Sequence, residues 1–129
     1  MNNHLDEQVV YGSFIGNCYI LNIQGEIDEV YLKQLYAETF FIIEHNVDLK
    51  GTIFDFSNIS TFDSNIFISL RNISKTISLM GIKVIWIGLK PGVVSTLVDL
   101  NVKSDDIRIA VNLQHSLSLI NSKESDFLL

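Results

Sequence analysis

Residues 53–64 read IFDFSNISTFDS. In this stretch a short apolar strand ends, a polar loop follows, and a long amphipathic helix is expected to begin near Ser64. A serine at a helix N-terminus has two interpretations. Its oxygen can cap the helix by accepting a hydrogen bond from an unpaired backbone N–H. Alternatively its hydroxyl is a phosphorylation site, because the same N–H groups and the helix dipole attract a phosphate.

Strand-like and helix-like segments alternate on both sides of this stretch. Two strand-like runs between residues 9 and 27 are separated by Gly16-Asn17, a turn signal that predicts an opening hairpin. Residues 52–56 and 82–87 are apolar runs typical of central strands covered on both faces, and residues 107–111 predict a last short strand. With helices between them, these strands predict an α/β sandwich with a mostly parallel central sheet and about four helices.

The four helices are expected where apolar residues recur at helical spacing. The first begins at the N-cap Asp28 and ends near residues 45–46, with a buried stripe predicted at Leu32, Leu35, Tyr36, Thr39, Phe40 and Ile43. The second begins near Ser64 and ends at Gly81, with a buried stripe predicted at Ile66, Leu70, Ile73, Ile77 and Met80. The third begins at Pro91, and the fourth spans residues 114–120.

Length and composition predict one domain, because 129 residues with 47% hydrophobic side chains form a single core. We expect a flexible N-terminus over residues 1–8, a single domain over 9–121 and a C-terminal tail over 122–129. The net charge of −6 argues against nonspecific binding to nucleic acid or anionic lipid. The single cysteine and the absence of a secretion signal or membrane span indicate a cytoplasmic protein.

Few residues favour catalysis. The three histidines, His4, His45 and His115, have no metal-ligand spacing and no cysteine cluster beside them, so no metal or other cofactor is expected. The loop that begins at Gly88 has a proline where a phosphate-binding loop needs backbone donors. Cys18 lies within a predicted strand and is interpreted as a buried structural thiol. We therefore expect a protein that is not an enzyme.

Asp55 offers a remote alternative. An aspartate that ends a strand, together with Lys90-Pro91 after a later strand, is typical of a receiver domain that accepts phosphate on the aspartate. That site also needs a pair of acids after the first strand to hold Mg²⁺, and residues 9–22 contain none. A receiver site at Asp55 is therefore a weak hypothesis.

The helix after Ser64 has a second side with a distinct character. At about 100° per residue, several residues lie together opposite the predicted buried stripe. With the adjoining Asp63 we call this set the Ser64 face: Asp63, Ser64, Ile68, Arg71, Lys75 and Leu79. Isolated apolar residues at a surface are ordinary. The alternative is a partner-binding surface, since phosphate on Ser64 adds a charge of about −1.5 to −2 beside Asp63.

Several motifs resemble one family. The chain is similar to STAS domains, the family of bacterial anti-anti-sigma factors, and within it to the small antagonists of stressosomes. The likeness runs from Asn17 to about Ile120 through six motifs: QGEID (24–28), DFS (55–57), FDS (62–64), LMGIKV (79–84), GLKPGVVSTL (88–97) and DL (99–100).

The resemblance implies a regulatory scaffold of a stress-signalling complex. Ser64 matches the serine that a switch serine/threonine kinase phosphorylates in the family. Thr96 matches a position that some stressosome paralogues use as a second phosphosite, and this match is the weaker of the two. In such proteins the unmodified form sequesters the kinase together with STAS paralogues that carry sensor domains. Phosphorylation releases the kinase, and a cognate phosphatase resets the site. For Thr96 a purely structural role within a helix stays open.

Two alternatives also stay open. The residues after Ser64 are Asn65-Ile66, whereas many sporulation-type members have Ser-Gly there, which favours the stressosome branch. A free anti-anti-sigma factor that binds an anti-sigma kinase in a small complex is the first alternative. The second is the receiver-like domain that uses Asp55.

Overall fold

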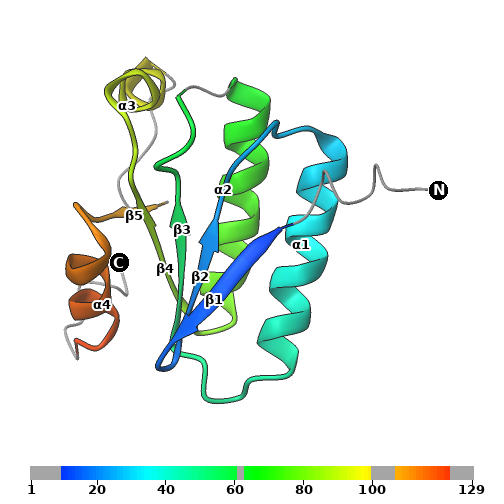
Figure 1. The fold of residues 1–129 in the computed structure, drawn as a ribbon, viewed down its shortest axis with the longest axis vertical. Coiled ribbons are helices and arrows are strands. Elements are labelled where there is room, and N and C mark those ends of the chain that lie inside the picture. Colours follow the sequence, from blue (N-terminus) through cyan, green and yellow to red (C-terminus); the bar gives the residue numbers. More distant parts are fainter. Residues whose placement is uncertain (1–9, 61–62, 100–106, 123–129) are drawn as a thin grey trace.

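The chain alternates strands and helices as the sequence predicts (Figure 1). The computed structural model describes residues 10–60, 63–99 and 107–122, and of residues 96–99 only the backbone. The predicted segments 1–8 and 122–129 lie outside these residues, apart from Ser122. The elements are β1 (Tyr11–Ile15), β2 (Cys18–Asn22), α1 (Glu29–Glu44), β3 (Gly51–Asp55), α2 (Ser64–Leu79), β4 (Lys83–Ile87), α3 (Pro91–Asp99), β5 (Arg108–Ile109) and α4 (Leu113–Ile120).

The five strands form one mixed sheet in the order β1-β2-β3-β4-β5. β1 and β2 are antiparallel and are joined at Gly16-Asn17, where Gly16 has a φ of 59° that glycine adopts without strain. The other neighbouring pairs are parallel. The predicted opening hairpin and mostly parallel sheet are therefore confirmed, although the last strand is shorter than the predicted 107–111.

Helices cover both faces of the sheet. α1 and α2 lie on one face over the larger core, which contains Phe54, Phe56 and Trp86 (Figure 1). α4 lies on the other face, where Ile120 packs with Ile53 and Ile85. α3 follows β4, at the edge of the sheet where the parallel strands end.

Two predicted buried positions are wrong. Tyr36 of α1 is 51% exposed, because it lies on the flank of the helix, and Tyr31 is buried instead with its hydroxyl accepting a hydrogen bond from Gln24 N at 3.4 Å. Met80 is 49% exposed because it is the C-cap of α2, where Gly81 turns the chain at a φ of 87°. The other predicted stripe residues are buried or partly buried against the core.

Candidate functional site

Asp63, not Ser64, caps α2. Asp63 Oδ1 accepts a hydrogen bond from Ile66 N at 2.9 Å, and Asp63 O accepts the first helical bond from Phe67 N at 3.0 Å. Ser64 is therefore the first helical residue, and it is partly exposed. The capping interpretation of Ser64 is wrong, because a carboxylate one residue earlier takes that role. The Ser64 hydroxyl is not needed to begin the helix.

The Ser64 face is directed away from the core. The residues that α2 buries are Phe67, Leu70, Ile73, Ser74 and Ile77. On the opposite side Ile68 is 42% and Leu79 82% exposed, and Lys75 is also exposed. Arg71 lies at the border, partly buried, with its guanidinium carbon 5.9 Å from the centre of the Phe67 ring. The helical spacing thus predicted the outward side correctly, and its use as a binding surface stays a prediction.

A buried hydrogen bond holds α2 against the sheet. Trp86 of β4 donates from Nε1 to Ser74 Oγ at 2.9 Å, and both side chains are buried. The indole also contacts three phenylalanine rings with centroid distances of 4.8, 5.9 and 6.3 Å: Phe56, Phe67 and Phe54. Phe67 and Ser74 were missing from the predicted stripe. A buried tryptophan needs an acceptor for its N–H, and that need could have pointed to Ser74.

The Asp55 carboxylate is already engaged in a turn. Its Oδ1 accepts hydrogen bonds from Ser57 N at 2.9 Å and from Ser57 Oγ at 2.5 Å. Gly88 lies against the same group, since a Cβ built on it would be 2.9 Å from Asp55 Oδ1. Among residues 10–60, 63–99 and 107–122, no three His, Cys, Asp or Glu side chains are grouped to hold a metal ion. The geometry thus gives Asp55 a structural role.

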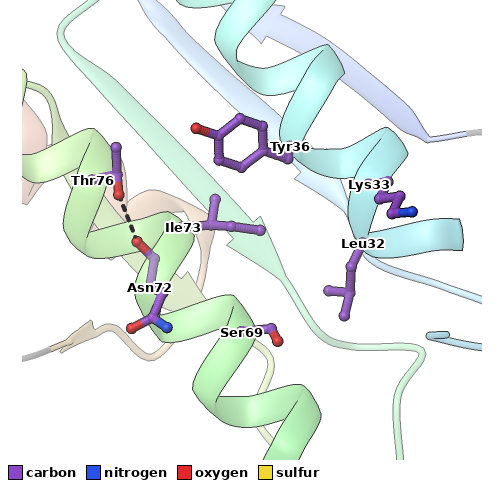
Figure 2. A pocket seen from close by; sticks show the side chains of 7 residues that line it. All are labelled: Leu32, Lys33, Tyr36, Ser69, Asn72, Ile73 and Thr76. Carbon is purple, nitrogen blue, oxygen red and sulfur yellow. Dashed lines mark hydrogen bonds between the residues drawn. The ribbon is translucent and has the colours of Figure 1, made fainter. Parts of the chain in front are cut away.

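A groove separates α1 from α2 (Figure 2). It has a volume of about 380 Å³ and is open to solvent. Its wall is formed by Leu32, Lys33, Tyr36, Ser69, Asn72, Ile73 and Thr76. Thr76 Oγ1 donates to Asn72 O at 2.9 Å and so turns back to its own helix. Among these lining residues Lys33 is the one charged side chain.

The remaining candidate residues have ordinary surroundings. His45 and His115 are exposed at the end of α1 and the start of α4, and His4 lies outside the described residues. Cys18 is 1% exposed, and burial raises the pKa of its thiol, which confirms a buried cysteine. The backbone of Thr96 lies in α3, and its side chain is outside what the structure describes. No helix in the described part of the chain is long and apolar enough to cross a membrane.

Solved structures share this fold. The chain superposes on a serine-to-glutamate variant of RsbS from Moorella thermoacetica with a TM-score of 0.73 and 25% identity, covering 86% of this chain and 93% of that one. A chain in a structure of the stressosome, described as a signal integration and transduction hub, gives a TM-score of 0.64 and 25% identity over 85% and 95%. The anti-sigma factor antagonist SpoIIAA in its unphosphorylated form gives 0.67 and 13% over 87% and 96%, which shows the fold alone.

The comparison with curated proteins gives no match. The family model described as the STAS domain matches residues 13–116, a range that starts in β1 and ends in α4. This range contains every strand of the sheet except the first two residues of β1, and it contains the whole Ser64 face. The match covers most of the chain, and the fold agrees with it. The protein therefore belongs to the STAS domain family.

Proposed function

We propose that this protein is a non-catalytic scaffold of a stress-signalling complex, which sequesters a switch serine kinase through the Ser64 face until Ser64 is phosphorylated. The observation that carries the proposal is the position of Ser64 as the first residue of α2, beside a carboxylate that already caps the helix. A phosphate can be added there without removing the cap. The 25% identity to RsbS and to a stressosome chain supports a stressosome-like assembly rather than another STAS context.

The charge of the Ser64 face explains why phosphorylation should weaken binding and not strengthen it. The Ser64 face contains one acidic residue, Asp63, and two basic residues, Arg71 and Lys75, so its formal charge is +1. A phosphate on Ser64 contributes about −1.5 to −2 and therefore reverses the sign of the face. The exposed side chains of Ile68 and Leu79 supply apolar contact area on the same surface. A kinase surface whose charge complements the unmodified Ser64 face is then repelled by the phosphorylated face.

The fold should tolerate this change. A negative group in the first turn of a helix is favourable by about 0.3–1 kcal/mol at an exposed position, because the helix dipole is positive there. α2 is also held by the buried bond between Ser74 and Trp86, ten residues further along the helix from Ser64. Phosphorylation is thus expected to alter the docking surface and leave the core unchanged. A phosphatase that recognises the exposed helix start would restore the binding form.

The test is binding of a purified switch serine/threonine kinase to four proteins: wild type, Ser64→Ala, Ser64→Asp and Ser118→Asp. Ser118 is an exposed serine on α4, on the other face of the sheet, and it is the matched control for an added negative charge. We expect Ser64→Asp to weaken binding at least tenfold, with the other variants unchanged and all melting temperatures similar. Retained affinity in Ser64→Asp, or release of Ser64→Ala by kinase and ATP, would contradict the proposal.

Two measurements separate the alternatives. A free antagonist of the SpoIIAA type would form a small complex with its kinase, whereas a scaffold mixed with a sensor-bearing STAS paralogue should elute as a much larger particle. Phosphorylation of Asp55 by acetyl phosphate and Mg²⁺, with Ser64 unmodified, would instead favour a receiver-like domain. The bonds between Asp55 and Ser57 argue against that outcome.

A further inference from the structure

Ser122, the last residue that the structure describes, lies beside the start of β4. Lys83 is the first residue of β4, and its Nζ donates to Ser122 O at 2.7 Å and to Ile120 O at 3.0 Å. Figure 1 shows that α2 ends and β4 begins at the same end of the sheet. The segment that follows Ser122 in the sequence therefore starts near the C-terminal end of α2.

This end of α2 exposes apolar side chains beside lysines. Leu79 is 82% and Met80 49% exposed. Lys75 is also exposed, and it lies one helical turn before Leu79 on the same side of α2. Lys50 is exposed as well, and its carbonyl accepts a hydrogen bond from Lys83 N at 3.0 Å, which places it next to the start of β4. We call Lys50, Lys75, Leu79 and Met80 the α2 end patch.

This end of the sheet is positive in an acidic protein. Five charged residues of the described chain lie there: Lys50, Lys75, Lys83, Glu44 and Asp48. Their formal charge is +1, against −6 for the whole chain. Asp48 lies toward the β1–β2 hairpin, where it lines a hollow with Phe14 and Asn17, and Glu44 is the last residue of α1. A negative segment is therefore attracted most on the side of α2 and β4.

The sequence after Ser122 complements the α2 end patch. Residues 123–129 read KESDFLL, so two acids, Glu124 and Asp126, precede three apolar residues at 127–129. A segment that leaves Ser122 toward α2 passes Lys50 first and then meets Leu79 and Met80. The order of acidic and apolar residues in the segment is the order of basic and apolar residues in the patch.

The α4 side of the sheet offers a poorer match. Val111, which precedes α4, is 80% exposed and so supplies an apolar side chain there as well. Residues 109–122, however, contain no lysine or arginine. The two acids of the segment therefore have no basic partner along α4.

The segment is long enough to reach the patch. An extended chain advances at most about 3.6 Å per residue, so residues 128 and 129 can lie up to about 22–25 Å from Ser122. Met80 is three residues before Lys83, and at most about 11 Å of backbone separates the two. The remaining length is sufficient to pass the Lys83 side chain that joins Ser122 to β4.

We propose that residues 124–129 dock on the α2 end patch of the same chain, with their apolar side chains on Leu79 and Met80 and their acids beside Lys50. Covering exposed apolar side chains removes them from water, which is favourable. Each contact is weak alone. Because the segment is tethered at Ser122, docking is intramolecular, and the effective concentration of a short tethered segment is in the millimolar range.

Docking would limit access to part of the Ser64 face. Leu79 belongs to that face and lies about 22 Å along α2 from Ser64, at a rise of about 1.5 Å per residue. A kinase that uses the whole face then has to displace the segment, and this consequence alone rests on the proposed function. The test below uses no kinase, so a failure of docking is distinct from a failure of the proposed function.

The test is disulfide formation in the full chain under mild oxidation, since a disulfide requires Cβ atoms about 3.5–4.5 Å apart. One protein carries Leu79→Cys and Leu128→Cys, and the control carries Val111→Cys and Leu128→Cys. Val111 is as exposed as Leu79, and α4 is only about 12 Å long, so the segment reaches it too. We expect the first disulfide to form at least tenfold faster. Cys18 should not interfere, because it is 1% exposed.

Two further substitutions test the contacts. Phe127→Ser removes an apolar side chain of the segment, and it should slow the disulfide between positions 79 and 128 at least fivefold. Lys50→Glu should slow it at least threefold, because the two acids then meet a negative charge. Lys33→Glu is the control for charge, since Lys33 is an exposed residue near the start of α1, and it should leave the rate unchanged.

Three results would overturn the proposal. The first is an equal rate for the two cysteine pairs, because the segment would then have no preferred site. The second is a disulfide that joins two copies, seen as a dimer without reductant, in place of one within the chain. The third is a rate that Phe127→Ser does not change. Melting curves of the reduced variants that match wild type exclude misfolding as the cause of a slower reaction.

Discussion

Removing the Ser74 hydroxyl should destabilise the whole domain. Ser74→Ala leaves the Trp86 indole N–H, which is 0% exposed, without its acceptor 2.9 Å away. An unsatisfied buried donor costs about 1–3 kcal/mol. At about 1.4 kcal/mol for each factor of ten, the ratio of unfolded to folded protein rises by a factor between about 5 and about 140. The melting temperature should fall by about 4 °C for each kcal/mol in a domain of this size.

Urea unfolding monitored by tryptophan fluorescence measures this change directly. Trp86 is the single tryptophan of the chain, so its emission reports on the core in which the bond lies. Ser78→Ala is the matched control, since Ser78 is an exposed serine of the same helix. Its effect should stay within about 0.5 kcal/mol, as for other surface substitutions.

A Ser74→Ala protein as stable as the Ser78→Ala protein would refute the reasoning. A double-mutant cycle with Trp86→Phe, followed by circular dichroism, adds a second condition. Ser74→Ala should cost less in the Trp86→Phe background, because phenylalanine leaves no unpaired donor. Equal costs in the two backgrounds would mean that Ser74 contributes through packing and not through this bond.

Three further predictions concern other parts of the fold. Lys83 Nζ donates to Leu119 O at 3.3 Å, Ile120 O at 3.0 Å and Ser122 O at 2.7 Å. Lys83→Met should therefore accelerate hydrogen exchange in α4. Lys90→Met is the control, and equal exchange in the two variants would contradict the prediction. Among the described residues, none is a hydrogen-bond partner of the buried Thr52 Oγ1. Thr52→Val should therefore leave urea stability equal or raise it by up to about 1 kcal/mol, and a loss above that amount would be inconsistent with an unsatisfied hydroxyl. Burial is the largest cause and the neighbouring Glu38 the second of a rise in the pKa of Tyr19 from its usual 10.0 to about 12. Because the folded state holds this proton more tightly than the unfolded state, the stabilisation is fully present below pH 10 and should be lost between pH 10 and 12. Melting curves of Tyr19→Phe should therefore decline less steeply over this alkaline range than those of wild type.

The elements with strong local signals were predictable from sequence. Gly16-Asn17 fixed the hairpin, and Asp28 marked the start of α1, where its Oδ1 accepts a bond from Tyr31 N at 2.8 Å. The outward side of α2 also followed from helical spacing. In each case residues close in sequence determine the conformation, so a local pattern is sufficient.

The incorrect predictions concern positions whose burial depends on residues distant in the sequence. The buried side of α2 is centred on Phe67 and Ser74 because Trp86, on another strand, packs against both. An apolar count gives no weight to a serine, and it therefore placed Met80 in the core instead. Capping by Asp63 was missed for a related reason, since Asp63 and Ser64 are both good caps and only the geometry of the loop selects between them.

The order of the strands bears on how the chain is made. Every strand lies next to the strand that precedes it in sequence, so no strand has to be inserted between two already formed. During synthesis each new strand then has a neighbour that has already been made, and the domain is expected to fold as one unit. Of the elements that the structure describes, β5 and α4 are made last, and α4 then contacts Lys83. We therefore expect nascent chains that end after β4 to remain sensitive to proteases, because the core on the α4 face is then incomplete.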